Sequence, residues 1–172
     1  MGTNQRTQIV MSDDEIDSFI TRSRTATLAT VSATGVPHLV AMWYAVLPGA
    51  DGRPEIWFET KAKSQKVVNL RRNPVCTAMI EDGLTYNTLR GIAIEGHAEI
   101  VEDPDTLLRV GISVWERYNG EYTAEMRPFV DQMMNKRIAV RIVADRTRSW
   151  DHRKLGLPEM PVAGSTAQYL SE

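Results

Sequence analysis

The sequence contains one cysteine, Cys76, and no uninterrupted apolar run close to the length of a membrane span. A single cysteine excludes a disulfide within the chain, and its place in the run VCTAMI favours a small buried side chain over a reactive thiol. A membrane helix needs about 20 consecutive apolar residues, and the first eleven residues lack the apolar core of a signal peptide. We therefore expect a soluble cytoplasmic protein with no membrane partner.

Charge of one sign is also scarce, because 20 lysines and arginines nearly match 22 acids and leave a net charge of −2. The overall field of such a chain attracts neither nucleic acid nor membrane, so any anion site has to be local. The histidines His38, His97 and His152 lack metal-ligand spacing, and no metal site is predicted. No GxSxG, Walker A or GxGxxG motif occurs, so the catalytic residues stay unknown. If the protein is an enzyme, we expect a cofactor to carry its chemistry.

What the sequence does contain is an alternation of strand-like runs and short helices. The strand-like runs are 25–33, 36–47, 55–60, 75–81, 91–101 and 136–145. The helix-like runs are 12–23, 65–73, 104–119 and 124–135. Ser12 with Glu15 forms a capping box, and Gly35 marks a hairpin. Pro74 ends the second helix, and Asp103 with Pro104 begins the third. Pro128 lies well inside the last helical run, where an interruption is expected.

About six strands with hairpin-like connections predict a mainly β fold, an antiparallel barrel with peripheral helices, formed as one domain. A doubly wound parallel sheet is disfavoured because no crossover helix separates the first strands. Residues 1–11 are expected to form a flexible N-terminal arm. The stretch after residue 145 lacks periodicity and contains several Pro and Gly breaks, so no regular element is predicted there.

The most unusual stretch of the sequence is FETKAKSQKVVNLRRNP, residues 58–74, where a strand leads into a short helix. The cations of this stretch are Lys61, Lys63, Lys66, Arg71 and Arg72, with no acid between the first and the last. A helix N-terminus has unpaired N–H groups and a partial positive charge, and it therefore binds phosphate or carboxylate groups well. The sequence thus favours an anion site at the start of this helix over a merely solvated surface.

The anion site is predicted to comprise Thr60, Lys61, Ser64 and Lys66, which we call the cradle below. Lys66 lies in the first turn, from which its side chain can fold back toward the cap at Ser64. Arg71 and Arg72 lie near the end of the helix, where favourable interaction with the helix dipole is a sufficient explanation for them.

The order of these segments resembles the split β-barrel flavin and deazaflavin oxidoreductases, the superfamily of pyridoxamine 5′-phosphate oxidase. The motifs that carry the resemblance are TKAKSQKVVNLRRNP, the hairpin LATVSATGVPHLVAMWY and the strand GIAIEGHAEIVEDPD, and together they span roughly residues 12–154. The resemblance implies a six-stranded antiparallel split β-barrel over residues 12–150. It also implies a C-terminal tail, 151–172, that contacts the partner subunit of a homodimer with cofactor sites at the interface.

The resemblance also implies which residues hold the cofactor. The expected cofactor-binding residues are Met42, Trp43, Thr60, Lys61, Ser64, Lys66, Asn69, Arg71, Trp150, Arg153 and Lys154. Met42 and Trp43 would lie along the ring system, the cradle would hold the phosphate, and Asn69 would fix the helix against the barrel. The last three residues of that set, in the motif WDHRKL, would reach the cofactor of the partner subunit.

Among cofactors used in the superfamily, the compact form KSxKVxNLRRNP and the WDHRKL tail look more like the B branch of the F420-dependent reductases. The chain has no match to the RxVLLK strand of pyridoxamine-phosphate oxidase. The phosphate of F420 continues into an oligoglutamate tail, and such a polyanion can use the surplus of cations beyond the cradle. FMN is the alternative cofactor.

The resulting expectation is an F420-dependent enzyme that transfers a hydride from the reduced deazaflavin to an unsaturated small-molecule acceptor such as an enone, a quinone or a tetrapyrrole-like compound. An FMN-dependent oxidoreductase is the alternative within enzymes. A non-catalytic flavin or F420 carrier protein is the alternative of another class, and it would share every binding residue. The sequence does not separate carrier from enzyme, because hydride transfer leaves no catalytic side-chain motif.

Overall fold

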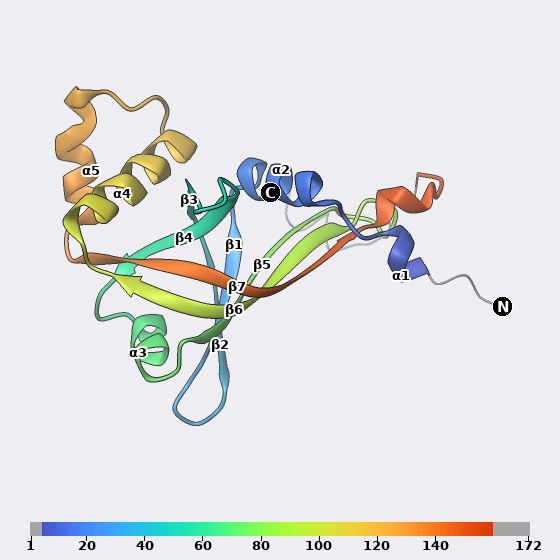
Figure 1. Cartoon of the computed structure of the whole chain (residues 1–172), viewed down its shortest axis with the longest axis horizontal. Coiled ribbons are helices and arrows are strands. Elements are labelled where there is room, and N and C mark those ends of the chain that lie inside the picture. The colour runs from blue at the N-terminus through green and yellow to red at the C-terminus, as the bar shows by residue number, and fades with distance from the viewer. Residues whose placement is uncertain (1–4, 160–172) are drawn as a thin grey trace, which may run out of the picture.

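A computed structural model describes residues 5–159 of the chain as one curled antiparallel sheet with helices around its ends (Figure 1). The order of the seven strands in the sheet is β2-β1-β5-β6-β7-β4-β3. Their bounds are β1 (Ala26–Val31), β2 (Pro37–Met42), β3 (Ala45–Pro48), β4 (Pro54–Lys61), β5 (Val75–Asp82), β6 (Arg90–Val101) and β7 (Arg137–Asp151). The mainly β, antiparallel split-barrel fold predicted from the sequence is confirmed, with seven strands instead of six.

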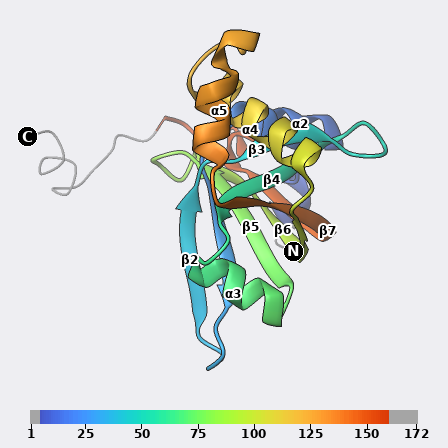
Figure 2. The same cartoon turned by 90° about the vertical axis from the view of Figure 1, so that its left-hand side faces the viewer.

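The helices lie around the ends of the sheet. They are α1 (Gln5–Gln8), α2 (Asp13–Arg22), α3 (Gln65–Arg72), α4 (Pro104–Tyr118) and α5 (Arg127–Met134), with the 3-10 turns η1 (Ala124–Met126) and η2 (His152–Leu155). Helices α4 and α5 pack together at one end, and η2 lies at the opposite end beside α1 (Figure 1). Helix α3 packs beside β1 on the same side of the molecule as the α4–α5 pair (Figures 1 and 2). No helix within residues 5–159 is long and apolar enough to cross a membrane.

Local capping signals in the sequence are confirmed. The Ser12 hydroxyl accepts from the Glu15 amide at 3.3 Å, and the Glu15 carboxylate accepts from the Ser12 amide at 2.7 Å. Gly35 takes a φ of 83° in the β1–β2 hairpin, a conformation that glycine adopts without strain. Asp103 caps α4 by accepting from the Thr106 amide at 2.8 Å. These elements were predictable because each signal acts on its own neighbours in the chain.

The seventh strand arises because the run predicted at 36–47 is two strands, β2 and β3, separated at Trp43 and Tyr44. The Tyr44 side chain is fully buried, and its hydroxyl donates to the carbonyl of Ile20 at 2.6 Å. The Tyr44 amide donates to the hydroxyl of Tyr118 instead of to a neighbouring strand, over 2.9 Å. The backbone therefore leaves the β1 ladder after Met42 and continues in the ladder of β4.

The interruption expected near Pro128 is present, and two other boundaries differ from the sequence prediction. The last helical run is a 3-10 turn followed by α5, which starts at Arg127 and places Pro128 in its first turn, where proline fits. Strand β7 continues to Asp151, well beyond residue 145, because its second half pairs with the first half of the long strand β6. A β-bulge at Glu95-Gly96 bends this pair. Residues 5–11, expected as an arm, include α1, and the Ile9 carbonyl accepts from the Asp151 amide at 2.7 Å.

The two faces of β4 bury different parts of the core. Phe58 faces the main cluster inside the curled sheet together with Leu28 and Ile80. Trp57 faces a second cluster under α4, together with Val110 and Val114. Because the strand alternates, its last residues also point to opposite faces, and this alternation sets the geometry of the cradle.

Candidate functional site

The cradle forms where β4 ends and α3 begins, at the end of the sheet away from η2 (Figure 1). Thr60 is 4% exposed and is the last buried residue of β4. Its hydroxyl lies 3.2 Å from the Ser64 hydroxyl and accepts from the Lys66 ammonium at 3.2 Å. The strand end, the turn and the first helical turn thus bring Thr60, Ser64 and Lys66 together, as the sequence predicts.

The N-terminus of α3 has no side-chain cap within the described structure. Ser64 occupies the N-cap position, but its hydroxyl bonds with Thr60 and accepts from no helical amide. The first amides of an α-helix have no intrahelical acceptor, and they carry the positive end of the helix dipole. An anion at this position would satisfy those amides and lie beside the Lys66 ammonium.

A second turn of the chain completes the cradle. The Lys61 ammonium donates to the carbonyl of Asn135 at 2.9 Å, and the Ala62 amide donates to the carbonyl of Lys136 at 3.1 Å. Arg137, the first residue of β7, lies directly opposite Lys61 in the β4–β7 ladder. The start of β7 therefore adds a cation, Arg137, that the sequence analysis did not include in the site.

Arg137 forms an ion pair with Glu59, the residue before Thr60. The side chain of Glu59 is 11% exposed and that of Arg137 is 29% exposed. The Nε atom of Arg137 is buried and has no hydrogen-bond partner among the described residues. The pair therefore brings a shielded carboxylate close to the cations of the cradle and leaves one guanidinium N–H unpaired.

Burial and charge shift the pKa values of two of these groups. Burial raises the pKa of the Glu59 carboxyl above its ordinary value, and the bond with Arg137 and the charges of Lys61 and Lys66 oppose that shift. Burial lowers the pKa of the Lys66 ammonium, and the charge of Glu59 opposes this shift while that of Arg137 adds to it. An anion at the cradle would restore the preference of Lys66 for its charged form.

Asn69 holds α3 against the sheet. It is 1% exposed, its amide nitrogen donates to the Thr30 hydroxyl of β1 at 3.0 Å, and its amide oxygen accepts from Gln65 at 2.9 Å. At the end of the helix, Arg71 pairs with Glu102 at 2.7 Å, and Arg72 donates to the carbonyl of Val31. These contacts position the helix, and the two arginines have partners of their own within the chain.

Met42 and Trp43 lie where β2 gives way to β3. Met42 is half-buried and packs against the main core, whereas Trp43 is 57% exposed. The Trp43 ring stacks on Tyr118 of α4 with ring centroids 4.3 Å apart and planes 6° apart. The Tyr118 hydroxyl donates to the carbonyl of Arg24 at 2.7 Å. Trp43 is therefore an exposed aromatic side chain whose orientation is held by the Tyr118 ring.

The C-terminal residues predicted to bind cofactor lie at the other end of the sheet (Figure 1). Trp150 lies against Gly91, where an added Cβ would approach the indole to 2.3 Å. Arg153 pairs with the buried carboxylate of Asp151, and Lys154 pairs with Glu15 of α2 at 2.6 Å. The structure does not bring these residues to the cradle of the same chain. A contact between them and a cofactor held there would require a second subunit, and it stays a prediction.

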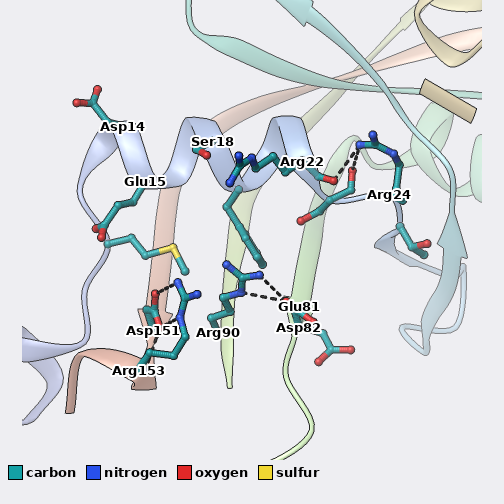
Figure 3. A pocket seen from close by; sticks show the side chains of 14 residues that line it. Asp14, Glu15, Ser18, Arg22, Arg24, Glu81, Asp82, Arg90, Asp151 and Arg153 are labelled. Atoms are coloured by element: carbon teal, nitrogen blue, oxygen red, sulfur yellow. Dashed lines mark hydrogen bonds and ion pairs between the residues drawn. The ribbon is translucent and has the colours of Figure 1, made fainter. Parts of the chain in front are cut away.

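Below α2 lies a cavity of about 630 Å³, a volume typical of small-molecule sites (Figure 3). Its floor carries two neighbouring ion pairs, Arg90 with Asp82 and Arg153 with Asp151. Arg90 also stacks over the ring of Phe19 at 5.0 Å from its centroid. Each of the two aspartates has a lowered pKa, chiefly because its arginine donates to it. The first pair joins β5 to β6, the second joins the end of β7 to η2, and the contact between Arg90 and Phe19 links the first pair to α2.

Two residues of the candidate site were missed by sequence reasoning, Glu59 and Arg137. The sequence analysis predicted a strand at 136–145, and its alternation puts Arg137 on the face away from Ile138 and Val140. It did not show that this strand pairs with the strand before the basic stretch. Within residues 5–159, no three His, Cys, Asp or Glu side chains gather in a way that could hold a metal ion.

Comparisons with known proteins place this geometry in a family. Conserved hypothetical protein Rv2991 from Mycobacterium tuberculosis is 66% identical, over 95% of this chain and 99% of that chain, with a TM-score of 0.89. A structure described as an F420 reductase is 25% identical over 76% of this chain and 94% of that one, with a TM-score of 0.55. HutZ, the heme storage protein from Vibrio cholerae, has the same fold at 18% identity, with a TM-score of 0.60 over 80% of this chain and 95% of that one.

Among curated proteins, no sequence matches this chain. The family model described as pyridoxamine 5′-phosphate oxidase matches residues 12–151, which include every strand of the sheet and the whole cradle. The chain belongs to the pyridoxamine 5′-phosphate oxidase family.

Proposed function

We propose that the protein is an F420-dependent reductase that transfers a hydride from the reduced deazaflavin to an unsaturated organic acceptor. The observation that carries the proposal is the uncapped N-terminus of α3 with Thr60, Ser64 and Lys66 converging on it. Family membership and the 25% identity with an F420 reductase support a cofactor of the flavin or deazaflavin type. The residues present fit the phosphate of either, because unpaired amides and an ammonium are the groups that bind phosphate.

F420 is favoured over FMN by the cations around the cradle. Lys63 is exposed and makes no interaction within the described structure, and the Lys61 ammonium binds only the carbonyl of Asn135. Arg137 adds a third cation, which Glu59 partly offsets. One phosphate needs two or three cations, whereas the oligoglutamate tail of F420 adds further carboxylates. Arg71 contributes less to this argument than the sequence suggests, because Glu102 already pairs with it.

We also propose that a second copy of the chain completes the site. An exposed, largely apolar face of the sheet runs across β2, β1 and β5, where Leu39 lies opposite Ala29 and Met79 lies opposite Thr27. Leu39 is 61% exposed and Met79 is 37% exposed, which is unusual for large apolar side chains in a sheet. A symmetric dimer through this face would bury these side chains and bring Trp150, Arg153 and Lys154 of the partner toward the cradle.

In the proposed mechanism, the cradle and the α3 amides hold the cofactor by its phosphate, and Trp43 supports the ring system. The bound deazaflavin supplies the hydride. The stack on Tyr118 fixes the orientation of the Trp43 indole, which would shield one side of a bound ring system from water. No side chain is assigned as proton donor, and a proton from solvent suffices for the reduction of an activated double bond.

The function is tested by titrating the purified protein with F420 and with FMN at two salt concentrations, and then by mixing the reduced complex with enones and quinones. We expect tighter binding of F420, weakened by salt as exposed charges are screened, and faster oxidation of bound than of free reduced F420. Tighter binding of FMN would favour the flavin-dependent alternative. Tight binding of F420 without any acceleration across the acceptors would favour a carrier.

A further inference from the structure

A negative charge beside an anion site is unexpected, and Glu59 places one next to the cradle. Its carboxylate is 11% exposed and pairs with Arg137, which lies opposite Lys61 in the ladder. Thr60, the next residue, accepts from the Lys66 ammonium. The charges that act on the Glu59 carboxyl are therefore those of Lys61 and Lys66 in the cradle and of Arg137 beside it.

A second pair on the same two strands shows what a purely structural pair looks like. Glu55 and Arg141 join β4 to β7 with an Oε1–Nη2 distance of 2.6 Å, and they lie four residues back along the strand. That spacing corresponds to about 13 Å from the Glu59 pair along an extended strand. Arg141 also binds Glu99, so its charge is fully matched, whereas the Nε of Arg137 has no partner among the described residues.

The charge balance of the site follows from these contacts. Lys61, Lys66 and Arg137 contribute three positive charges, and Glu59 offsets one of them without blocking the α3 amides. A phosphate monoester, as in FMN, carries nearly two negative charges at neutral pH because its second pKa is about 6. A phosphate diester, such as the one that links F420 to its tail, carries one. A fixed negative charge nearby repels the monoester about twice as strongly.

We propose that Glu59 is a specificity-determining residue of the cradle that disfavours a second charge on the bound phosphate and so biases the site toward phosphodiesters. This inference rests on the proposed function only in placing a phosphate at the cradle. It holds for a flavin as well as for a deazaflavin, because it concerns the phosphate and not the ring.

The test compares two ligands that differ by one charge, FMN and its 5′-phosphate methyl ester, at pH 8, where the monoester is a dianion. Affinities are measured by fluorescence titration for the wild type, Glu59→Gln, Glu59→Asp and Glu55→Gln. In Glu59→Gln we expect the affinity for FMN to rise about 3- to 10-fold more than the affinity for the methyl ester. Glu59→Asp keeps the charge and should keep the wild-type ratio, and Glu55→Gln should do the same because its pair is remote.

Thermal melts of the ligand-free variants separate this effect from a structural one. A merely structural role for Glu59 would lower the melting temperature and change both affinities alike, and an unchanged ratio in Glu59→Gln would overturn the inference. Should the variant fail to fold, Arg137→Lys supplies the readout. This variant keeps the cation but loses the guanidinium bond that holds the Glu59 carboxylate, so FMN should lose more affinity than the ester. In Arg137→Lys, an unchanged ratio of FMN affinity to ester affinity would also overturn the role of Glu59.

The outcome for the proposed function is separate. F420 is titrated alongside. If the wild type binds FMN more tightly than F420, the F420 assignment is removed. A changed ratio of FMN affinity to ester affinity in Glu59→Gln would still support the role of Glu59. A preference for F420 with no change of ratio would keep the assignment and reject the role of Glu59. If none of these ligands binds, both are overturned.

Discussion

Lys66 is the side chain on which the cradle depends most, and replacing it gives the sharpest test of the site. Its ammonium donates to Thr60 and lies in the first turn of the uncapped helix α3, so it can contact an anion already held by the helix amides. Lys66→Met removes the charge and keeps an apolar stem of similar length. One charge-assisted hydrogen bond in a partly desolvated site contributes about 1.5–3 kcal/mol. We therefore expect F420 affinity to fall about 10- to 100-fold.

The assay is a fluorescence titration of F420, run beside thermal melts of the cofactor-free proteins. Arg72→Met is the matched control, because it removes a cation from the same helix. The Arg72 side chain binds the carbonyl of Val31 and not the cradle. Its loss should change affinity by less than about threefold, within the range of surface substitutions. If Arg72→Met weakened binding as much as Lys66→Met, or if Lys66→Met bound F420 like the wild type, the cradle would have been assigned to the wrong turn of α3.

Three further predictions follow from other contacts. Burial lowers the pKa of the Lys66 ammonium below its ordinary value of 10.5. The affinity for the cofactor should therefore be full at neutral pH and fall as the pH rises through that lowered pKa. Lys66→Arg should flatten this profile, and a wild-type affinity that rises with pH would contradict it. Asn69→Ala leaves the Thr30 hydroxyl without its partner and should reduce the free energy of unfolding by about 1–3 kcal/mol, measured by urea denaturation. An unchanged free energy of unfolding would mean that water replaces the amide. Leu39→Glu on the exposed sheet face should convert a dimer of about twice 19.3 kDa to a monomer, measured by light scattering. The control Leu84→Glu, in the β5–β6 loop, should leave the dimer intact. Equal masses for the two variants would exclude this face as the interface.

Most of the helix boundaries could be predicted from the sequence because their signals are local. The capping box of Ser12 and Glu15, the hairpin at Gly35 and the cap at Asp103 each involve residues a few positions apart. The convergence of Thr60, Ser64 and Lys66 was also predictable, since a strand end and a first helical turn within seven residues allow few arrangements.

The remainder depended on contacts between distant segments. Strand β2 separates from β3 because the Tyr44 amide binds the hydroxyl of Tyr118, and no local pattern announces a partner so far along the chain. The same holds for Arg137, whose place beside the cradle follows from the register of β7 against β4. Glu59 reads as an ordinary polar position of a half-buried strand until that register is known. Glu59 and Arg137, the pair proposed to discriminate among ligands, were therefore the residues that the sequence alone did not identify.

A crystal structure of the protein with F420 would locate the bound phosphate and so decide where the cofactor site lies. We predict the phosphate at the N-terminus of α3, within hydrogen-bonding distance of the helix amides and of the side chains of Ser64 and Lys66. The ring system is expected near Trp43. A phosphate bound instead in the cavity below α2, between Arg90 and Arg153, would contradict this prediction.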